Sequence, residues 1–219
     1  GTSGIGYDIS KKFVSLKNNV TVIGRKIIHP KIPSVNYLLY NLANNIQFTA
    51  SLRKLEKIKK INTIIYCIGG SLGLNDLSYD VYFKVWNLNV GIPIKINDYL
   101  IKKKLISKKS HIFFFSSMAA SDLSGKPAYN IANASLESYA ENLTKFLQRD
   151  KIFVNCIKPS IVTATGNNWY KCKKENPKKF NYYIKKFNRK GLEINSMHIF
   201  NKIIILMNKK KQTSVIKYV

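Results

Sequence analysis

His111 to Asn133 read HIFFFSSMAASDLSGKPAYNIAN, and this stretch decides the fold class. Its first five residues form an apolar run that predicts a buried strand, and two serines follow directly. A helical pattern begins at about residue 127, with Tyr129 in its first turn. A strand that leads into a helix is the repeating unit of a parallel α/β sheet. A serine at a strand end that faces a tyrosine at a helix start also forms an acid–base pair suited to carbonyl chemistry.

The same alternation of strands and helices runs along the rest of the chain. We expect further strands at residues 20–23, 46–48, 63–67, 153–157 and 214–219. We expect helices at residues 7–18, 34–44, 52–60, 80–107 (interrupted near Pro93), 127–149, 166–190 and 195–208. The strands are nearly continuous apolar runs, which is typical of a sheet covered on both faces. The sequence therefore predicts one α/β domain over residues 1–219, with a doubly wound, mostly parallel sheet and helices on both faces.

The composition is that of an ordinary globular protein, with 45% hydrophobic and 22% charged residues. The longest apolar runs are far too short to span a bilayer, so we expect no membrane segment. Three widely spaced cysteines (Cys67, Cys156 and Cys172) fit reduced thiols and neither a disulfide framework nor a metal site. These observations predict a cytoplasmic protein without a metal centre.

A net charge of +26 is the most extreme bulk property of the chain. Only four of the basic residues are arginines (Arg25, Arg53, Arg149 and Arg189), and lysines are spread along the whole sequence. A surface selected to bind phosphates would favour the forked arginine side chain. We therefore interpret the charge as a general lysine excess and do not expect a nucleic-acid partner, although a nucleic-acid-binding protein is kept as a third hypothesis. The charge should still attract anionic ligands.

The chain begins with a glycine-rich turn, GTSGIG at residues 1–6, followed by a helical pattern. Glycines allow a close backbone approach, and a helix N-terminus offers free N–H groups to a pyrophosphate. We expect a dinucleotide to contact Gly1, Ser3, Gly4, Ile5 and Gly6. Such a turn normally follows a strand. We therefore expect that the first strand of the sheet is missing from this sequence and that its neighbours in the sheet lack their partner.

Two other strand ends are candidates for cofactor contacts. Gly24-Arg25 ends the second expected strand of a doubly wound sheet, where an acidic residue would select NAD. A guanidinium at this place suits a 2′-phosphate, so we expect NADP, with NAD as the alternative. Cys67, Ile68 and Gly69 lie at the carboxyl end of a buried strand, where ligands bind in open α/β sheets.

These motifs together resemble those of the classical short-chain dehydrogenase/reductases, which have a Rossmann-like fold. The resemblance covers essentially the whole chain apart from the expected first strand. The matching motifs stand in the order of the family: GTSGIG at 1–6, Gly24-Arg25, CIGG at 67–70, NLNV at 87–90, Ser116-Ser117, Tyr129 and VNCIKPSIVT at 154–163. Each motif is modest by itself, and their order and spacing make the match specific.

The resemblance implies a catalytic tetrad of Asn, Ser, Tyr and Lys, of which Asn89, Ser117 and Tyr129 are present. It implies that Tyr129 protonates the substrate oxygen as hydride arrives, that Ser117 holds this oxygen, and that Asn89 positions a water. Ser116 is the alternative register for the serine, and Asn87 is a second asparagine nearby. The resemblance also implies cofactor contacts from Asn89, Tyr129 and the residue at 133, and from the segment that covers the nicotinamide, with Pro159, Ile161 and Thr163.

Asn133 stands where the family has its lysine, four residues after the tyrosine. A neutral amide can hydrogen-bond a ribose but supplies no positive charge. Lys126 precedes Tyr129 and is not expected to replace that lysine. Our first hypothesis is an oxidoreductase that transfers hydride between NADP(H) and a carbonyl or alcohol, with activity weakened by Asn133. The alternative is a catalytically impaired member that serves as a cofactor-binding or assembly subunit.

The partners follow from the same pattern. We expect a small-molecule substrate, and the lysines between Lys171 and Lys190, a segment that suits a substrate lid, hint at an anionic or carrier-linked one. The alternative account of these lysines is a solvated basic surface. The resemblance implies a homodimer or homotetramer that pairs the helical regions 80–106 and 127–149.

Overall fold

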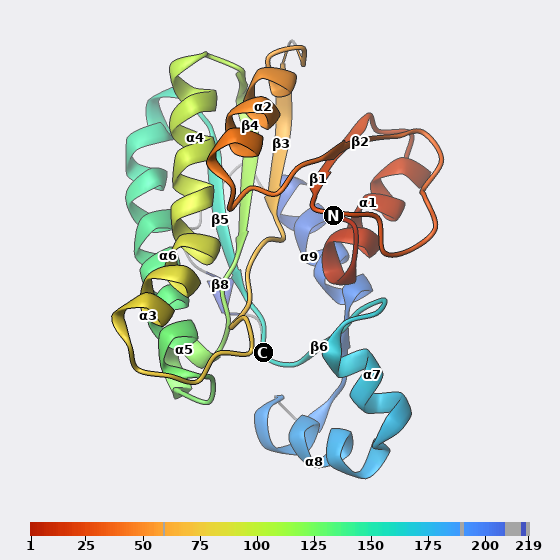
Figure 1. Ribbon diagram of the computed structural model, residues 1–219. Helices are drawn as coiled ribbons and strands as arrows, with labels where there is room; N and C mark the ends of the chain where they lie inside the picture. Colours follow the sequence, from red (N-terminus) through yellow and green to blue (C-terminus); the bar gives the residue numbers. More distant parts are fainter. Residues whose placement is uncertain (59, 189–190, 209–215, 218–219) are drawn as a thin grey trace. The chain divides into compact units, whose positions relative to one another are not determined.

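A computed structural model describes residues 1–58, 60–188, 191–208 and 216–217 (Figure 1). The chain divides into two compact units. The first unit contains Gly1–Ser51 and Ser160–Asn208, and the second contains Leu52–Pro159 together with Ile216–Lys217. The prediction of a single domain over residues 1–219 stays a prediction.

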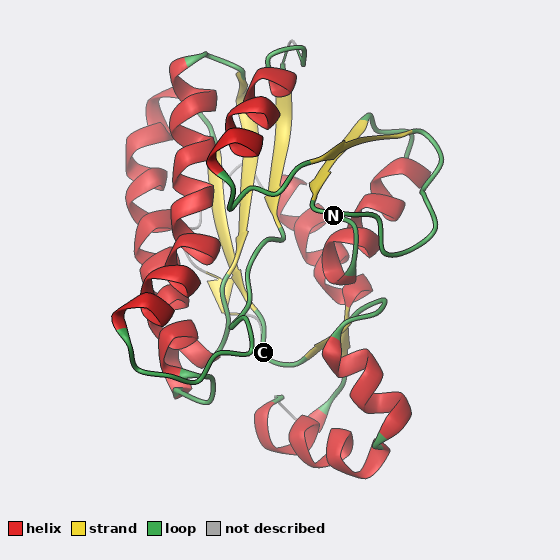
Figure 2. Cartoon of the chain, in the orientation of Figure 1, coloured by secondary structure: helices red, strands yellow, loops and turns green. Residues whose placement is uncertain are grey.

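A four-stranded parallel sheet forms the core of the second unit (Figure 2). Its strands, in spatial order, are β3 (Ile61–Tyr66), β4 (Ile106–Phe115), β5 (Phe153–Lys158) and β8 (Ile216–Lys217). Ile112, Phe113 and Phe114 of β4 have no exposed surface. The apolar run that predicted this strand is continuous because both faces of the sheet are buried here.

The helices of the second unit are α3 (Tyr79–Trp86), the π-helical turn η1 (Asn87–Gly91), α4 (Ile92–Lys102), α5 (Ala119–Asp122), α6 (Pro127–Leu147) and the 3₁₀ turn η2 (Gln148–Asp150). Helices α4 and α6 lie side by side along one face of the sheet (Figure 1). A chain of buried hydrogen bonds joins them to it: Tyr66 Oη donates to Asn97 Oδ1 over 2.7 Å, and Asn97 Nδ2 donates to Tyr139 Oη over 3.0 Å. These two bonds fix the positions of strand β3, helix α4 and helix α6 relative to one another.

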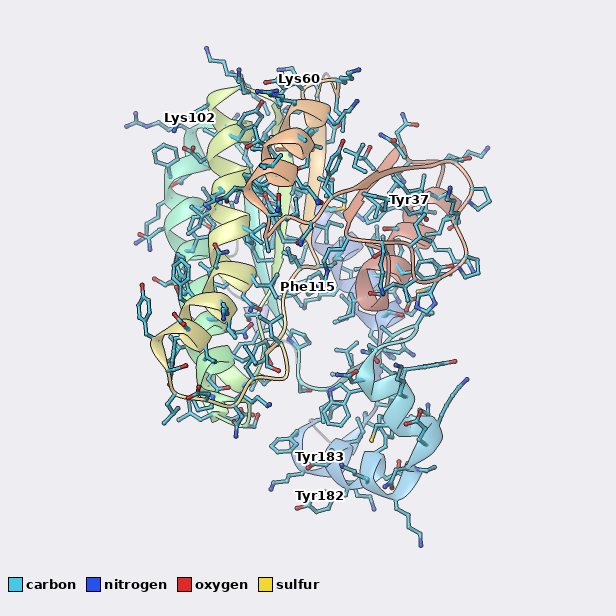
Figure 3. The ribbon with its side chains drawn as sticks, viewed as in Figure 1. Tyr37, Lys60, Lys102, Phe115, Tyr182 and Tyr183 are labelled. Atoms are coloured by element: carbon cyan, nitrogen blue, oxygen red, sulfur yellow. The ribbon has the colours of Figure 1, made fainter. Side chains whose placement is uncertain are left out.

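The first unit contains two smaller parallel sheets, β1 (Val20–Gly24) with β2 (Val35–Leu39) and β6 (Val162–Thr163) with β7 (Ile194–Asn195). Its helices are α1 (Gly4–Ser15), α7 (Asn168–Glu175), α8 (Pro177–Phe187) and α9 (Ser196–Asn208), and α2 (Asn45–Leu55) begins in this unit. Phe13 of α1 packs edge-on against Phe200 of α9, with ring centroids 5.2 Å apart. Tyr182 and Tyr183, labelled in Figure 3, lie on α8.

Three expectations about individual elements were wrong. Residues 35–39 form a strand and not a helix, because Val35 to Leu39 pair residue by residue with Val20 to Gly24. Residues 46–48 lie in a helix and not a strand, since α2 begins at Asn45. The long helical region ends at Lys102 and not at 107, and Lys104 adopts a left-handed φ of 52° before β4 begins at Ile106. The strand expected at 214–219 is described only at Ile216–Lys217, and its remaining residues lie outside the described part of the chain.

Within the described ranges, every helix is too short or too polar to cross a membrane. The same residues contain no group of three or more His, Cys, Asp or Glu side chains arranged to hold a metal ion.

Candidate active site

The two serines sit where β4 ends, in a turn that is fixed to β5 from both sides. Phe115 is the last residue of the strand (Figure 3). The Ser116 N–H donates to Ile157 O and the Met118 N–H donates to Pro159 O, both over 2.9 Å. Ser116 is buried, whereas Ser117 is half-buried. The Oγ of Ser117 accepts from the Ala119 N–H over 3.3 Å, so this hydroxyl also holds the turn that leads into α5. Its greater exposure favours Ser117 over Ser116 as the residue that meets a ligand.

Tyr129 lies in the first turn of α6, and its ring packs near the turn that carries Ser117. Both lie next to Gly125. A Cβ added to this glycine would be 3.0 Å from the Ala119 Cβ and 3.1 Å from the Tyr129 Cδ1. Ala119 and the Tyr129 ring therefore pack against the same glycine. Lys126 Nζ donates to Gly73 O in the loop after β3, which directs its cation to that loop.

Asn133 is 1% exposed and uses its amide within its own helix. Its Nδ2 donates to the Tyr129 backbone oxygen over 2.8 Å, an i to i−4 bond along α6. The side chain therefore braces the turn that carries Tyr129. It supplies no charge, as the sequence predicted.

Asn89 lies in η1 and holds the loop after β3. Its Oδ1 accepts from the Gly70 N–H over 3.0 Å, and its Nδ2 donates to Gly70 O over 3.0 Å and to Val85 O over 2.7 Å. A Cβ on Gly69, whose φ is +151°, would lie 2.5 Å from Asn89 Oδ1. Both amide hydrogens of Asn89 are thus engaged, and only its oxygen retains a lone pair for a water.

Cys67, Ile68 and Gly69 follow β3 directly, at the carboxyl end of the strand. Burial raises the pKa of the Cys67 thiol to about 11, so this cysteine stays protonated near neutral pH. Gly70 has a φ of +134° and open space where a Cβ would stand. The backbone beyond β3 is therefore accessible to a ligand at this edge of the sheet.

One feature of this unit was not predicted from the sequence, a buried lysine at the end of β5. Lys158 is 3% exposed, and its Nζ lies 2.9 Å from both carboxylate oxygens of Glu137 on α6. It also donates to Ser121 Oγ on α5. A lysine at the end of a mostly apolar strand was the available signal, because a buried cation requires a partner.

In the first unit, the glycine-rich turn begins α1 as predicted. Gly4 has a φ of +56°, which favours glycine. A Cβ on Gly1 would lie 2.8 Å from Val22 on β1, so a larger residue could not stand there without a shift. The Gly4 N–H donates to Thr165 O and Asp8 Oδ2 accepts from the Thr165 N–H, at 2.9 and 3.0 Å. Close backbone approach at a helix N-terminus fits a dinucleotide phosphate. Ser3, Ile5 and Gly6 belong to the same turn, and Arg25 is exposed directly after β1.

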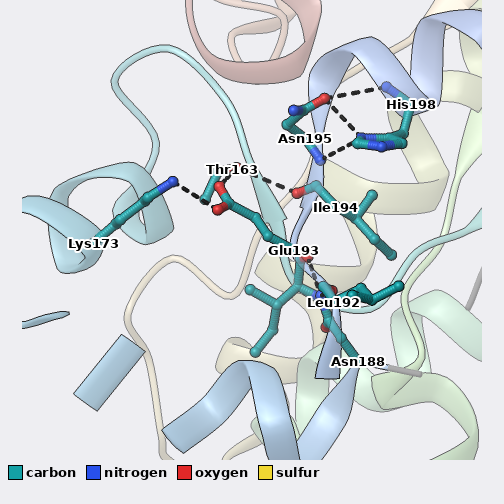
Figure 4. A network of polar contacts seen from close by, with 9 residues as sticks. Thr163, Lys173, Asn188, Leu192, Glu193, Ile194, Asn195 and His198 are labelled. Carbon is teal, nitrogen blue, oxygen red and sulfur yellow. Dashed lines mark hydrogen bonds and ion pairs between the residues drawn. The ribbon is translucent and has the colours of Figure 1, made fainter. Parts of the chain in front are cut away.

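A polar network in the first unit includes Thr163, Lys173, Asn188 and Glu193 (Figure 4). The side chain of Asn188 binds the Ile161 backbone twice, at 2.9 and 3.0 Å. The Thr163 hydroxyl donates to Glu193 Oε1 over 2.6 Å, and Lys173 Nζ lies 2.6 Å from Glu193 Oε2. Although burial raises the pKa of Glu193, the bonds from Lys173 and Thr163 outweigh it and lower this pKa overall. The hydroxyl of Thr163, a residue expected to cover the nicotinamide, is therefore engaged within its own unit.

Comparisons with known proteins identify the family and the fold of this chain. Residues 1–176 match the family model of the short chain dehydrogenases. No match was found among the curated proteins. A short chain dehydrogenase family protein from Francisella tularensis has a similar structure, with a TM-score of 0.81 and 20% identity over 99% of this chain and 93% of that one.

Two similar structures contain a nicotinamide cofactor. The structure of 4-hydroxyisoleucine dehydrogenase complexed with NADH has a TM-score of 0.80 and 18% identity, over 100% of this chain and 93% of that one. L-sorbose reductase from Gluconobacter frateurii, complexed with NADPH and L-sorbose, has a TM-score of 0.78 and 17% identity, over 99% and 90%. The chain belongs to the short chain dehydrogenase family, and the expected Rossmann-like fold, with parallel sheets flanked by helices, is confirmed.

Proposed function

We propose that this protein is an oxidoreductase that transfers hydride between NADP(H) and a carbonyl or alcohol substrate. The observation that carries the proposal is the packing of Tyr129 and of the Ser117 turn against one glycine, Gly125. A phenol and a hydroxyl on adjacent elements suit a substrate oxygen that must be held and protonated together.

Each side chain has a role in this proposal. Tyr129 gives its phenolic proton to the substrate oxygen during reduction and takes it back during oxidation. Ser117 donates a hydrogen bond to the same oxygen. Asn89 accepts a hydrogen bond from a water through Oδ1, since its two amide hydrogens hold Gly70 and Val85. Asn133 braces the turn below Tyr129 and leaves the site without the charge that a lysine provides.

The cofactor, when bound, supplies or accepts the hydride. Gly1, Ser3, Gly4, Ile5 and Gly6 would hold its pyrophosphate. Cys67, Ile68 and Gly69 would contact it through their backbone, Asn89, Tyr129 and Asn133 through their side chains, and Pro159, Ile161 and Thr163 would cover the nicotinamide. The exposed guanidinium of Arg25 supports NADP over NAD, because it can bind a 2′-phosphate in a bidentate manner.

The remaining parts of the proposal concern partners and location. Lysines on α7 and α8 support an anionic or carrier-linked small-molecule substrate. Exposed apolar side chains on α3 and α6, namely Tyr79, Phe83, Ile131 and Phe146, support pairing of these helices in a homodimer or homotetramer. We place the protein in the cytoplasm because its described cysteines are free thiols.

Binding and turnover should be measured separately. We expect NADPH to bind more tightly than NADH, and Arg25→Ala to weaken NADPH by about 10-fold or more while it leaves NADH unchanged, since hydrogen bonds to charged groups contribute about 1.5–3 kcal/mol. Titration by cofactor fluorescence gives both affinities, with Arg53→Ala as a matched control. Turnover is measured as NADPH oxidation with a panel of aldehydes and ketones.

The outcomes separate the two hypotheses. NADPH binding with turnover supports the oxidoreductase. NADPH binding with no turnover on any carbonyl or alcohol would instead favour the impaired subunit, for which no present finding gives support. If the parent and Arg25→Ala each bind NADPH and NADH with equal affinity, the proposed preference for NADP is wrong.

A further inference from the structure

Lys158 is the only residue of the described chain that combines a charged side chain with near-complete burial in the core of a sheet. It shares a sheet face with Cys156, because side chains alternate along a strand. Helix α6 covers this face and contacts β5. A buried cation is costly unless it is paired and hydrogen-bonded, and Lys158 satisfies both conditions through Glu137 and Ser121.

The three members of the cluster lie on α5, α6 and β5, which carry or adjoin the segments with Ser117 and Tyr129. Ser121 is on α5, which directly follows the turn that carries Ser117. Glu137 is on α6, eight residues after Tyr129 and four after Asn133. Lys158 itself lies between Ile157 and Pro159, whose carbonyls accept the backbone N–H groups on either side of Ser117.

The charge of Lys158 does not replace the missing lysine of the family. Glu137 binds it with both carboxylate oxygens, so the pair is neutral. The cluster instead fixes geometry. Because Lys158 contacts both carboxylate oxygens of Glu137, the pair sets the distance and the orientation of α6 relative to β5. The bond to Ser121 fixes α5 against the same ammonium.

We propose that the buried Lys158–Glu137–Ser121 cluster positions Ser117 relative to Tyr129, with Lys158 as the positioning residue. The inference rests on the proposed function for its kinetic readout, and it also has a structural readout that needs no turnover. Replacement of such a cluster by apolar residues often preserves stability, so a positional role can be tested apart from folding.

The test compares two double variants of the full chain. Lys158→Met/Glu137→Leu removes the buried pair. Lys102→Met/Asp98→Leu makes the same replacements at an exposed pair on α4, whose side chains are 73% and 55% exposed (Lys102 is labelled in Figure 3). The NMR signals of tyrosines labelled with ¹³C at Cζ report the phenol environments, and the Tyr129 signal is assigned as the one lost in Tyr129→Phe. Tyr182 of α8, which lies on neither of the helices changed in the two variants, is the reference signal.

We expect the Tyr129 signal to shift or broaden in Lys158→Met/Glu137→Leu and to stay in place in the control. We expect kcat to fall by about 10-fold or more with the KM for NADPH unchanged, because a misplacement of about 1 Å can cost about 100-fold in rate. Lys158→Arg keeps a cation that binds carboxylates in a bidentate manner, and should retain most of kcat.

Two results would overturn the inference: an unchanged Tyr129 signal with unchanged kcat, or equal effects in the control. If the double variant does not fold, Ser121→Ala is measured in its place, because it leaves the ion pair intact. It should still shift the Tyr129 NMR signal and lower kcat. A parent protein without any turnover would refute the proposed function alone, and the Tyr129 signal would then decide on the positioning role.

Discussion

Asn133 is the residue where this chain departs furthest from the chemistry of its family. Its amide donates to the Tyr129 carbonyl, so it stabilises the first turns of α6 but provides no cation beside the phenol. The sequence alone predicted the loss of charge. It could not predict the bond within the helix, because an asparagine inside a helix can point either to solvent or back to the i−4 carbonyl.

We expect Asn133→Lys to raise kcat. A cation one helical turn from Tyr129 favours the ionised phenol, and general acid–base catalysis is commonly worth about 100-fold or more, so a rise of about 10-fold is a conservative expectation. Steady-state kinetics with NADPH and a carbonyl substrate measure the effect. Asn133→Met, which has a long side chain without charge, is the control, and equal kcat in the two variants would show that the missing charge does not limit the rate.

At the scale of elements, the predictions succeeded where one physical signal dominated. The apolar run before Ser116 and the helical pattern after Lys126 were recovered as β4 and α6. The helix predicted for residues 35–39 was wrong because these residues form a strand by pairing with β1, a contact that the local sequence does not encode. The interruption expected near Pro93 occurs as the π-helical turn at Asn87–Gly91, which contains Asn89.

His111 on β4 makes the folding stability of the protein depend on pH. It stacks on Phe113 and on Phe153 of β5, with centroid distances of 5.9 and 5.0 Å. Burial lowers the pKa of His111 below its usual value of 6.5. Between the lowered pKa and 6.5 the unfolded chain binds the proton and the folded chain does not, so stability falls as pH decreases through this window.

We therefore expect His111→Leu to reduce the loss of stability below pH 6.5. Urea unfolding at pH 7.5 and at pH 5.5, followed by circular dichroism, measures the difference for the parent and for the variant. If both proteins lose the same stability between these two pH values, His111 is not the group responsible.

At the scale of the whole molecule, the order of the motifs was the most reliable signal. Glycine turn, strand-end glycines, serine and tyrosine appear in the family order, and the family match over residues 1–176 confirmed that interpretation. The Lys158–Glu137 pair could not be predicted from the sequence, because its members are 21 residues apart and meet only when α6 packs on β5. The identities of both residues were visible in the sequence, whereas their contact was not.

The net charge of +26 also acts at this scale. It raises the local concentration of anions such as a phosphorylated cofactor, without selecting among them. Under the proposed function, specificity comes from particular groups: Arg25 for the cofactor, and Tyr129 with Ser117 for the reacting oxygen.

The most direct test of the central claim is NADPH-dependent turnover in Tyr129→Phe, with Ser117→Ala beside it and Tyr99→Phe as the control. We predict that Tyr129→Phe abolishes turnover while NADPH still binds, weakened at most by the loss of the one phenol contact, because the proton donor is lost and the other cofactor contacts remain. Turnover in Tyr129→Phe equal to that of the parent would contradict the account, since another group would then have to protonate the substrate.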